Sequence, residues 1–391
     1  MASRPPKEPV ISLTSGPVTV YPRVLSALSR PVHYDHDDSF QAFYETVSRK
    51  AAKALGCAAP AVILQCEPAV ALEATAASLI GRDDVVLNLV SGVYGKGFGV
   101  WAARHAKEVT ELQVAYNEAI EPQAVAEALA ARPEVALVSL VHHDTPSGTL
   151  NPVAAIGEAV RRHGALFLVD AVSSFGGMAV GPEDCGADVF VTGPGKCLGG
   201  PPGLSLLAVS ERAWAHMEAR AERPSASVLS LTDWREAWRA DRGFPFTPSV
   251  AEVNALDAAL DHYLEQGPET VWRRHALTAR ACRAGVIAMG CRLWPAREAI
   301  AAPTTTAVVV PEGLEDEAIR AAARARYGVV FSAGRGATLG KLIRIGHMGP
   351  SAEPIYATVA VTALGGALRA LGFEARVGDG VDVALAAIDA G

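Results

Sequence analysis

Residues 164–209, GALFLVDAVSSFGGMAVGPEDCGADVFVTGPGKCLGGPPGLSLLAV, decide the fold of this chain. They contain two apolar runs, 165–169 and 187–191, and each leads into a turn of small residues. Asp170 ends the first run, and Lys196 follows the second in a loop of Gly and Pro. Continuous apolar runs are typical of buried parallel strands, whose ligands bind where the carboxyl ends of the strands open out. The stretch therefore predicts an α/β fold with both residues at one edge of a sheet.

A lysine amine and a carboxylate at one such edge suit a pyridine that carries a carbonyl group. The amine can form a Schiff base, and the carboxylate can pair with the protonated ring nitrogen. Taken singly, an Asp after a strand is often a helix cap and most lysines are solvated. The glycines and prolines around Lys196 favour a catalytic role over a structural one, because they allow the backbone to approach a ligand closely. We expect Lys196 and Asp170 to be the catalytic pair.

Three motifs relate the chain to a known family: DAVSSFGG at 170–177, TGPGKCLGGPPGLS at 192–205 and GKLIRIGHMGP at 340–350. The chain resembles the class V aminotransferases, fold type I enzymes that use pyridoxal 5'-phosphate and include alanine-glyoxylate and serine-pyruvate aminotransferases. The likeness covers nearly the whole chain from Ile11. It implies a large domain with a seven-stranded, mainly parallel sheet and a smaller α/β C-terminal domain.

The order of apolar and helical segments agrees with that fold. Helical stretches alternate with seven apolar runs, at residues 61–64, 85–89, 112–115, 135–141, 165–169, 187–191 and 204–209. Such alternation indicates parallel strands joined by right-handed helical crossovers.

Three parts of the chain follow from this order. Residues 1–20 are expected to form an arm, loose over 1–10, and a strand that joins the small domain. The large domain is predicted over 21–265 and the small one over 266–391, linked by one long helix over 250–290. Within the small domain we expect strands at 304–310 and 342–345 and helices at 314–327 and 352–371.

The composition is that of a globular enzyme. Of 391 residues, 50% are hydrophobic and 20% are charged, and the net charge of -7 gives no general attraction to nucleic acid or anionic membrane. No apolar run reaches the length of a membrane span, and the first residues lack the apolar core of a signal peptide. We expect a cytoplasmic protein. The six cysteines lack metal-site spacing, and HYDHDDSF at 33–40 is predicted to be an acidic helix cap, so no metal is expected.

Four further residues are candidates for substrate binding. Tyr94, among glycines, is expected to lie flat against the pyridine ring, and Thr145 to donate a hydrogen bond to the substituents of the ring. Without the resemblance, we would interpret Tyr94 as an ordinary buried side chain and Thr145 as a turn residue whose hydroxyl bonds its own backbone. The family places an arginine at the position of Arg344, whose planar fork matches a substrate carboxylate, whereas an interdomain salt bridge is the alternative. Arg335 is a second candidate, for the ring or for a neighbouring acid.

The turn before the helix after the first strand argues against a phosphate. In the phosphate-using relatives this turn is rich in Ser, Thr and Gly, whereas here it is QCEPAVALEA at 65–74. Glu67 would repel a phosphate charge about 4 Å away by about 4 kcal/mol at an effective dielectric constant of about 20. Pro68 offers no amide donor. Glu67 is instead expected to bind the free hydroxymethyl group of pyridoxal. The alternative is that its carboxylate only stabilises the N-terminus of the helix.

Two other positions also lack the donors of the phosphate-using relatives. Gly195 precedes the lysine where relatives commonly carry a polar residue, often Gln. Phe244 and Phe246 lie in the loop from which relatives supply a tyrosine hydroxyl to the neighbouring subunit.

Six further segments resemble an unusual branch of the family that belongs to bacterial vitamin B6 degradation; they lie at 77–80, 85–99, 142–149, 170–178, 244–250 and 323–336. The resemblance implies transamination of pyridoxamine with pyruvate to pyridoxal and L-alanine through a Schiff base on Lys196. No cofactor would be bound, and a homo-oligomer, a dimer of dimers, is implied. One alternative is a conventional enzyme that keeps pyridoxal 5'-phosphate and converts alanine, serine or glyoxylate. Another is a vitamin B6 binder that captures pyridoxal without turnover.

Overall fold

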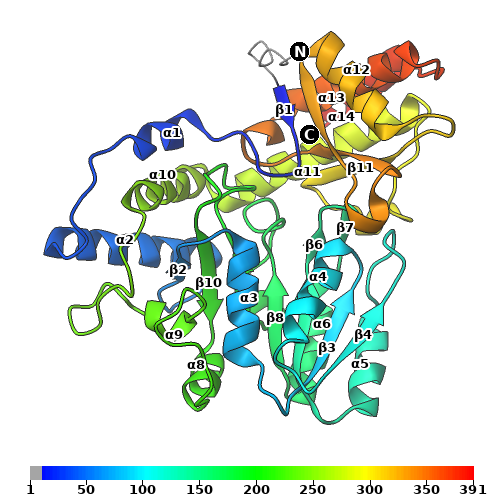
Figure 1. Cartoon of the computed structure of the whole chain (residues 1–391). Helices are drawn as coiled ribbons and strands as arrows, with labels where there is room; N and C mark the ends of the chain where they lie inside the picture. Colours follow the sequence, from blue (N-terminus) through cyan, green and yellow to red (C-terminus); the bar gives the residue numbers. More distant parts are fainter. Residues whose placement is uncertain (1–10) are drawn as a thin grey trace, which may run out of the picture.

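A computed structural model describes residues 11–391 (Figure 1). The loose arm expected over 1–10 lies outside the described residues. Two sheets organise the rest: a seven-stranded sheet in the first two thirds of the chain, and a four-stranded sheet that the C-terminal part shares with the N-terminal strand.

The seven-stranded sheet confirms the predicted fold class. Its order is β2-β10-β9-β8-β5-β3-β4, and β10 is antiparallel to both of its neighbours while the other pairs are parallel. The strands are β2 (Val62–Leu64), β3 (Val85–Val90), β4 (Glu108–Gln113), β5 (Val135–Val141), β8 (Leu166–Asp170), β9 (Val189–Thr192) and β10 (Ser205–Val209).

The strand β4 lies earlier in the sequence than the predicted run at 112–115. It forms one edge of the sheet and pairs only with β3, with Val85 opposite Glu108. No residue of β4 is fully buried. An edge strand needs no continuous apolar run, so the apolar pattern placed this strand imprecisely.

Helices cover both faces of this sheet (Figure 1). The helices of this part of the chain are α1 (Pro22–Leu28), which packs against α10, α2 (Asp38–Leu55), α3 (Pro68–Leu79), α4 (Val93–Ala102), α5 (Pro122–Ala131), α6 (Val153–His163), α7 (Pro182–Cys185), α8 (Glu211–Glu218), α9 (Leu231–Trp234) and α10 (Val250–Gln266). A short hairpin, β6 (His143–Asp144) and β7 (Thr149–Leu150), follows β5. The acidic segment at 33–40 does cap a helix, since Asp37 accepts a hydrogen bond from Ser39 N at 2.8 Å at the start of α2.

The single helix predicted over 250–290 is wrong. Two helices, α10 and α11 (Pro268–Ala288), occupy this range. Gly267 separates them with φ 81°, a left-handed conformation that favours glycine, and Pro268 begins the second helix. The Gly-Pro pair was the signal of this break.

The small sheet has the order β1-β12-β13-β11 and contains β1 (Ile11–Leu13), β12 (Val329–Ala333), β13 (Leu342–Gly346) and β11 (Thr305–Val309). Pairing of β1 with β12 is parallel and joins the N-terminal segment to the C-terminal part of the chain. Three helices pack near this sheet: α12 (Asp316–Tyr327), α13 (Ile355–Ala370) and α14 (Val377–Asp389). Short 3-10 turns span Glu298–Ile300, Gly336–Thr338 and Gly349–Ala352. The sequence analysis missed β12 and α14. Within residues 11–391, no helix is both long and apolar enough to cross a membrane.

The segment after β1 packs tightly on β13. A Cβ atom added to Gly346 would lie 2.0 Å from the carbonyl oxygen of Thr14. We expect Gly346→Ala to displace the N-terminal segment, to destabilise the protein by about 1–3 kcal/mol and to lower its Tm by about 1–4 °C. Scanning calorimetry checks this. Gly378→Ala is the control, because that glycine in α14 has nothing within 4 Å of the added atom; an equal Tm for both variants would contradict the prediction.

Candidate active site

Asp170 and Lys196 lie at neighbouring strand ends, as the sequence analysis expected. Asp170 is the last residue of β8, and Lys196 lies in the loop after the adjacent strand β9. The Asp170 carboxylate is only 9% exposed and accepts a hydrogen bond from Val172 N at 2.9 Å. Burial raises the pKa of Asp170 to about 7, although the Val172 N–H and the charge of Lys196 act in the opposite direction. The two groups are therefore electrostatically coupled at one edge of the sheet.

The amine of Lys196 lies between the large domain and the N-terminal segment. Its Nζ donates a hydrogen bond to the carbonyl oxygen of Ser15 at 2.8 Å. A Cβ atom on Gly16 would lie 2.1 Å from Nζ, so a side chain there would displace the amine. Burial, followed by the positive charge of Arg344, lowers the pKa of Lys196 to about 8. The neutral amine is the nucleophile that forms a Schiff base.

Tyr94 lies in the first turn of α4 beside two arginines from the small domain. The guanidinium carbon of Arg335 lies 5.6 Å from the centroid of the tyrosine ring, a cation–π contact. Tyr94 is half-buried, and Arg335 is exposed. The ring is thus the point where the large and small domains meet over the site.

Arg344, in β13, has its terminal nitrogens free. Its Nε donates to the carbonyl oxygen of Ala333 at 2.7 Å, which fixes the stem of the side chain. None of the ion pairs among residues 11–391 involves Arg344, so the interdomain salt bridge considered above is not formed in this structure. Burial lowers the pKa of Arg344, as expected for a cation without a bonded acid. A substrate carboxylate would match the free edge of this guanidinium.

Thr145 follows the strand β6 and is completely buried. Its hydroxyl has no hydrogen-bond partner among residues 11–391. A buried hydroxyl without a partner is uncommon, so this group is available to a ligand. Two residues earlier, His143 has its Nδ1 2.8 Å from the hydroxyl of Thr304, while its buried Nε2 has no partner among residues 11–391.

The N-terminus of α3 has no free donor in its first turn. Pro68 lacks an N–H, Ala69 N donates to the carboxylate of Glu67 at 2.9 Å, and Val70 N donates to the carbonyl oxygen of Glu67 at 2.9 Å. Glu67 is exposed, and its charge acts on both Lys196 and Asp170. The turn that would hold a phosphate in the family is thus closed by the chain's own carboxylate, and its residues do not fit a phosphate.

The other two positions singled out for missing donors have clear packing roles. A Cβ atom on Gly195 would lie 3.0 Å from the backbone of Pro202, which is tighter than ordinary contact. The rings of Phe244 and Phe246 pack within their own subunit, with centroids 4.8 Å from Tyr44 and 5.0 Å from Trp234 respectively.

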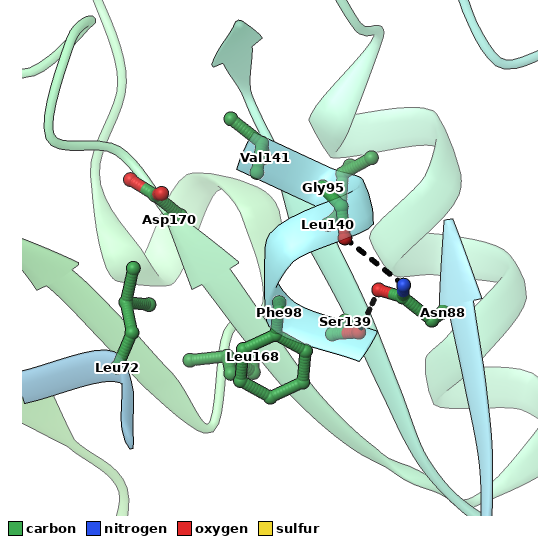
Figure 2. A pocket seen from close by; sticks show the side chains of 9 residues that line it. All are labelled: Leu72, Asn88, Gly95, Phe98, Ser139, Leu140, Val141, Leu168 and Asp170. Carbon is green, nitrogen blue, oxygen red and sulfur yellow. Dashed lines mark hydrogen bonds between the residues drawn. The ribbon is translucent and has the colours of Figure 1, made fainter. Parts of the chain in front are cut away.

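A small cavity next to Asp170 shows which polar residues the sequence analysis missed (Figure 2). It lies between α3, α4 and the sheet, and Asn88 and Ser139 line it from β3 and β5. Asn88 Nδ2 donates to the carbonyl oxygen of Gly95 at 3.0 Å, and the Ser139 hydroxyl donates to Asn88 Oδ1 at 2.8 Å. A polar residue within each of two apolar runs was the available signal.

Comparison with known proteins identifies the class. Residues 33–369 match the family model described as aminotransferase class-V, and the chain belongs to this family. It is 62% identical to the pyridoxamine–pyruvate transaminase of Mesorhizobium japonicum, with 98% of each chain covered. The crystal structure of pyridoxamine-pyruvate aminotransferase from Mesorhizobium loti superposes with a TM-score of 0.97 at 62% identity, again over 98% of each chain.

More distant relatives share the fold but differ in their named substrates. The ureidoglycine-glyoxylate aminotransferase of Bacillus subtilis superposes with a TM-score of 0.93 at 28% identity, and covers 98% of this chain and 99% of its own. The alanine–glyoxylate aminotransferase of Callithrix jacchus is 32% identical over 76% of this chain and 73% of its own. The resemblance inferred from the motifs is confirmed.

The lowered pKa of Lys196 predicts how its reactivity depends on pH. Because burial disfavours the ammonium form, the neutral amine forms from about pH 8 upward rather than above the ordinary value of 10.5. The rate constant for Schiff base formation with free pyridoxal should rise with pH, with its midpoint at about pH 8. Stopped-flow absorbance at several pH values measures it. A midpoint near that of an exposed lysine would show that the amine is not desolvated.

Proposed function

We propose that this chain transfers an amino group from pyridoxamine to pyruvate, which gives pyridoxal and L-alanine. The observation that carries the proposal is the 62% identity, over 98% of both chains, to the Mesorhizobium japonicum pyridoxamine–pyruvate transaminase. The positions of Lys196, Asp170 and Arg344 support it, since the reaction needs an amine, a partner for the ring nitrogen and a partner for a carboxylate.

Lys196 and Asp170 have complementary roles in this proposal. In the reverse direction, from pyridoxal and alanine, the Lys196 amine forms a Schiff base with pyridoxal and is displaced by the amino group of the incoming alanine. It then moves a proton between the Cα atom of the amino acid and the carbon that bears the imine. Asp170 keeps the ring nitrogen protonated, so that the ring accepts the electrons left when the proton departs. The burial of Asp170 strengthens this interaction by excluding water.

Four side chains bind and orient the substrates. Tyr94 stacks on the pyridine ring, and the unpaired hydroxyl of Thr145 donates to a ring substituent. Arg344 binds the carboxylate of pyruvate or alanine with its free terminal nitrogens, and Arg335 adds positive charge beside the ring of Tyr94.

We further propose that the pyridine substrate carries no phosphate. The closed first turn of α3 supports this, because Pro68 has no N–H and Glu67 already accepts from Ala69 N. The Glu67 carboxylate would instead bind the neutral hydroxymethyl group. Without a phosphate anchor, pyridoxal leaves after each half reaction, so the usual cofactor of the family becomes a substrate. Such an enzyme belongs to vitamin B6 degradation.

The proposal includes a cytoplasmic homo-oligomer, a dimer of dimers. Several large apolar side chains are well exposed in the single chain, among them Leu25, Val32 and Tyr34. Light scattering on the purified protein would test this assembly.

A turnover assay tests the main proposal. Dialysed protein is mixed with pyridoxamine and pyruvate, without any phosphate ester, and both pyridoxal and alanine are followed. We expect sustained formation of both products in equal amounts, and none from Lys196→Ala, which cannot form the Schiff base or move the proton. Activity only after addition of pyridoxal 5'-phosphate and an amino donor would instead identify a conventional member of the family. Aldehyde capture without turnover would identify a binding protein.

The role of Glu67 is tested by its replacement. Glu67→Ser removes a negative charge from the N-terminus of α3, so the ratio of the pyridoxal and pyridoxal 5'-phosphate dissociation constants should shift towards the phosphate by about tenfold or more. Absorbance titration with each aldehyde measures the ratio. Glu121→Ser is the matched control, because Glu121 precedes Pro122 at the start of α5 in the same way. Equal ratios of the two dissociation constants in the two variants would show that the charge of Glu67 does not select against the phosphate.

A further inference from the structure

The helix that carries Tyr94 has no cap of its own. The residue before its first turn is Gly92, which has no side chain that could accept a hydrogen bond. The first N–H groups of a helix need acceptors from elsewhere, and a helix with three glycines in its first two turns is intrinsically weak. Tyr94 therefore depends on other parts of the chain for its position.

The missing cap comes from Asp144, at the end of the hairpin strand β6. Its Oδ2 accepts hydrogen bonds from Tyr94 N at 2.9 Å and Gly95 N at 3.4 Å. The carboxylate fills the space beside Gly92, where an added Cβ atom would lie 2.1 Å from its carbon. Pairing of Asp144 with Thr149 across the hairpin, and two hydrogen bonds to its carbonyl oxygen, from Ser147 N and Gly148 N, fix its backbone. The helix end and the hairpin are thus locked together.

The charge of Asp144 acts on the other site residues as well. The side chain is completely buried, and its Oδ1 has no partner among residues 11–391. Burial raises the pKa of Asp144 to about 6, against the effect of the N–H groups and of Arg344. Its negative charge in turn raises the pKa of Asp170. A buried carboxylate is a costly choice for a cap, because a neutral amide could accept the same hydrogen bonds with less desolvation.

We propose that Asp144 is a positioning residue for the transamination proposed above, which holds the first turn of α4 so that the ring of Tyr94 faces the pyridine. Asn88, in β3, also holds this turn, because its Nδ2 donates a hydrogen bond to Gly95 O (Figure 2). Asp144 touches neither reacting atom in this scheme and acts through Tyr94. The inference rests on the proposed function, because it concerns the binding of pyridoxal.

The test compares pyridoxal dissociation constants, measured from the absorbance of the Schiff base. Loss of the helix cap and of the stacking that it orients predicts a dissociation constant about tenfold higher for Asp144→Ala. The dissociation constant of Asp144→Asn should stay within about twofold of that of the natural protein, because its amide oxygen can accept the same hydrogen bonds. Asp37→Asn is the matched control, because Asp37 caps α2 outside the site, and its dissociation constant should equal that of the natural protein. A role in stability alone would lower the Tm and leave the dissociation constant unchanged, which would overturn the proposal.

A double-variant cycle tests whether the effect passes through Tyr94. If it does, Tyr94→Ala combined with Asp144→Ala should bind pyridoxal as Tyr94→Ala alone does, within twofold. Additive losses would overturn the proposal. The natural protein distinguishes this failure from failure of the proposed function. If it forms pyridoxal and alanine while the losses in the cycle are additive, only the role of Asp144 is contradicted. If it does not bind pyridoxal at all, both the role of Asp144 and the proposed function are contradicted.

Discussion

Burial of the Lys196 amine between two domains is the constraint on which the site depends. The large sheet brings the amine to the end of β9 beside Asp170, and the N-terminal segment closes over it with the carbonyl oxygen of Ser15. Desolvation then brings the pKa values of the two groups towards each other, to about 8 for Lys196 and about 7 for Asp170. A nucleophilic amine and a nearby acid near neutral pH are what Schiff base chemistry requires.

Two helices begin at this site, and a carboxylate caps each of them. Glu67 caps α3 and Asp144 caps α4, so the helix ends that could attract an anion are already occupied. The free positive charges are side chains instead, above all Arg344. This distribution favours a small carboxylate held by an arginine over a phosphate held by backbone N–H groups, in agreement with the proposed substrates.

Much of the fold could be predicted because the core strands are continuous apolar runs. Such runs can be recognised in the local sequence alone. The positions of Asp170 and Lys196 at the edge of the sheet then follow from where two of these runs end. The errors lie where local pattern and tertiary role differ, at the exposed edge strand β4 and the break at Gly267. The glycine-rich helix α4 was also not predicted, because three glycines interrupt its helical pattern. That helix is stabilised by Asn88, just before it in the chain, and by Asp144, which lies 50 residues beyond Tyr94.

The sequence by itself determined the fold class, the Lys196 and Asp170 pair and the unusual Glu67-Pro68 turn, because apolar runs, glycine-rich loops and a proline act locally. Only the tertiary structure decided that Ser15 holds the lysine amine, that Arg344 has no acidic partner among residues 11–391, and that Asp144 caps the helix of Tyr94. These contacts join segments distant in the chain, and their energies come from burial and long-range hydrogen bonds that no local pattern encodes.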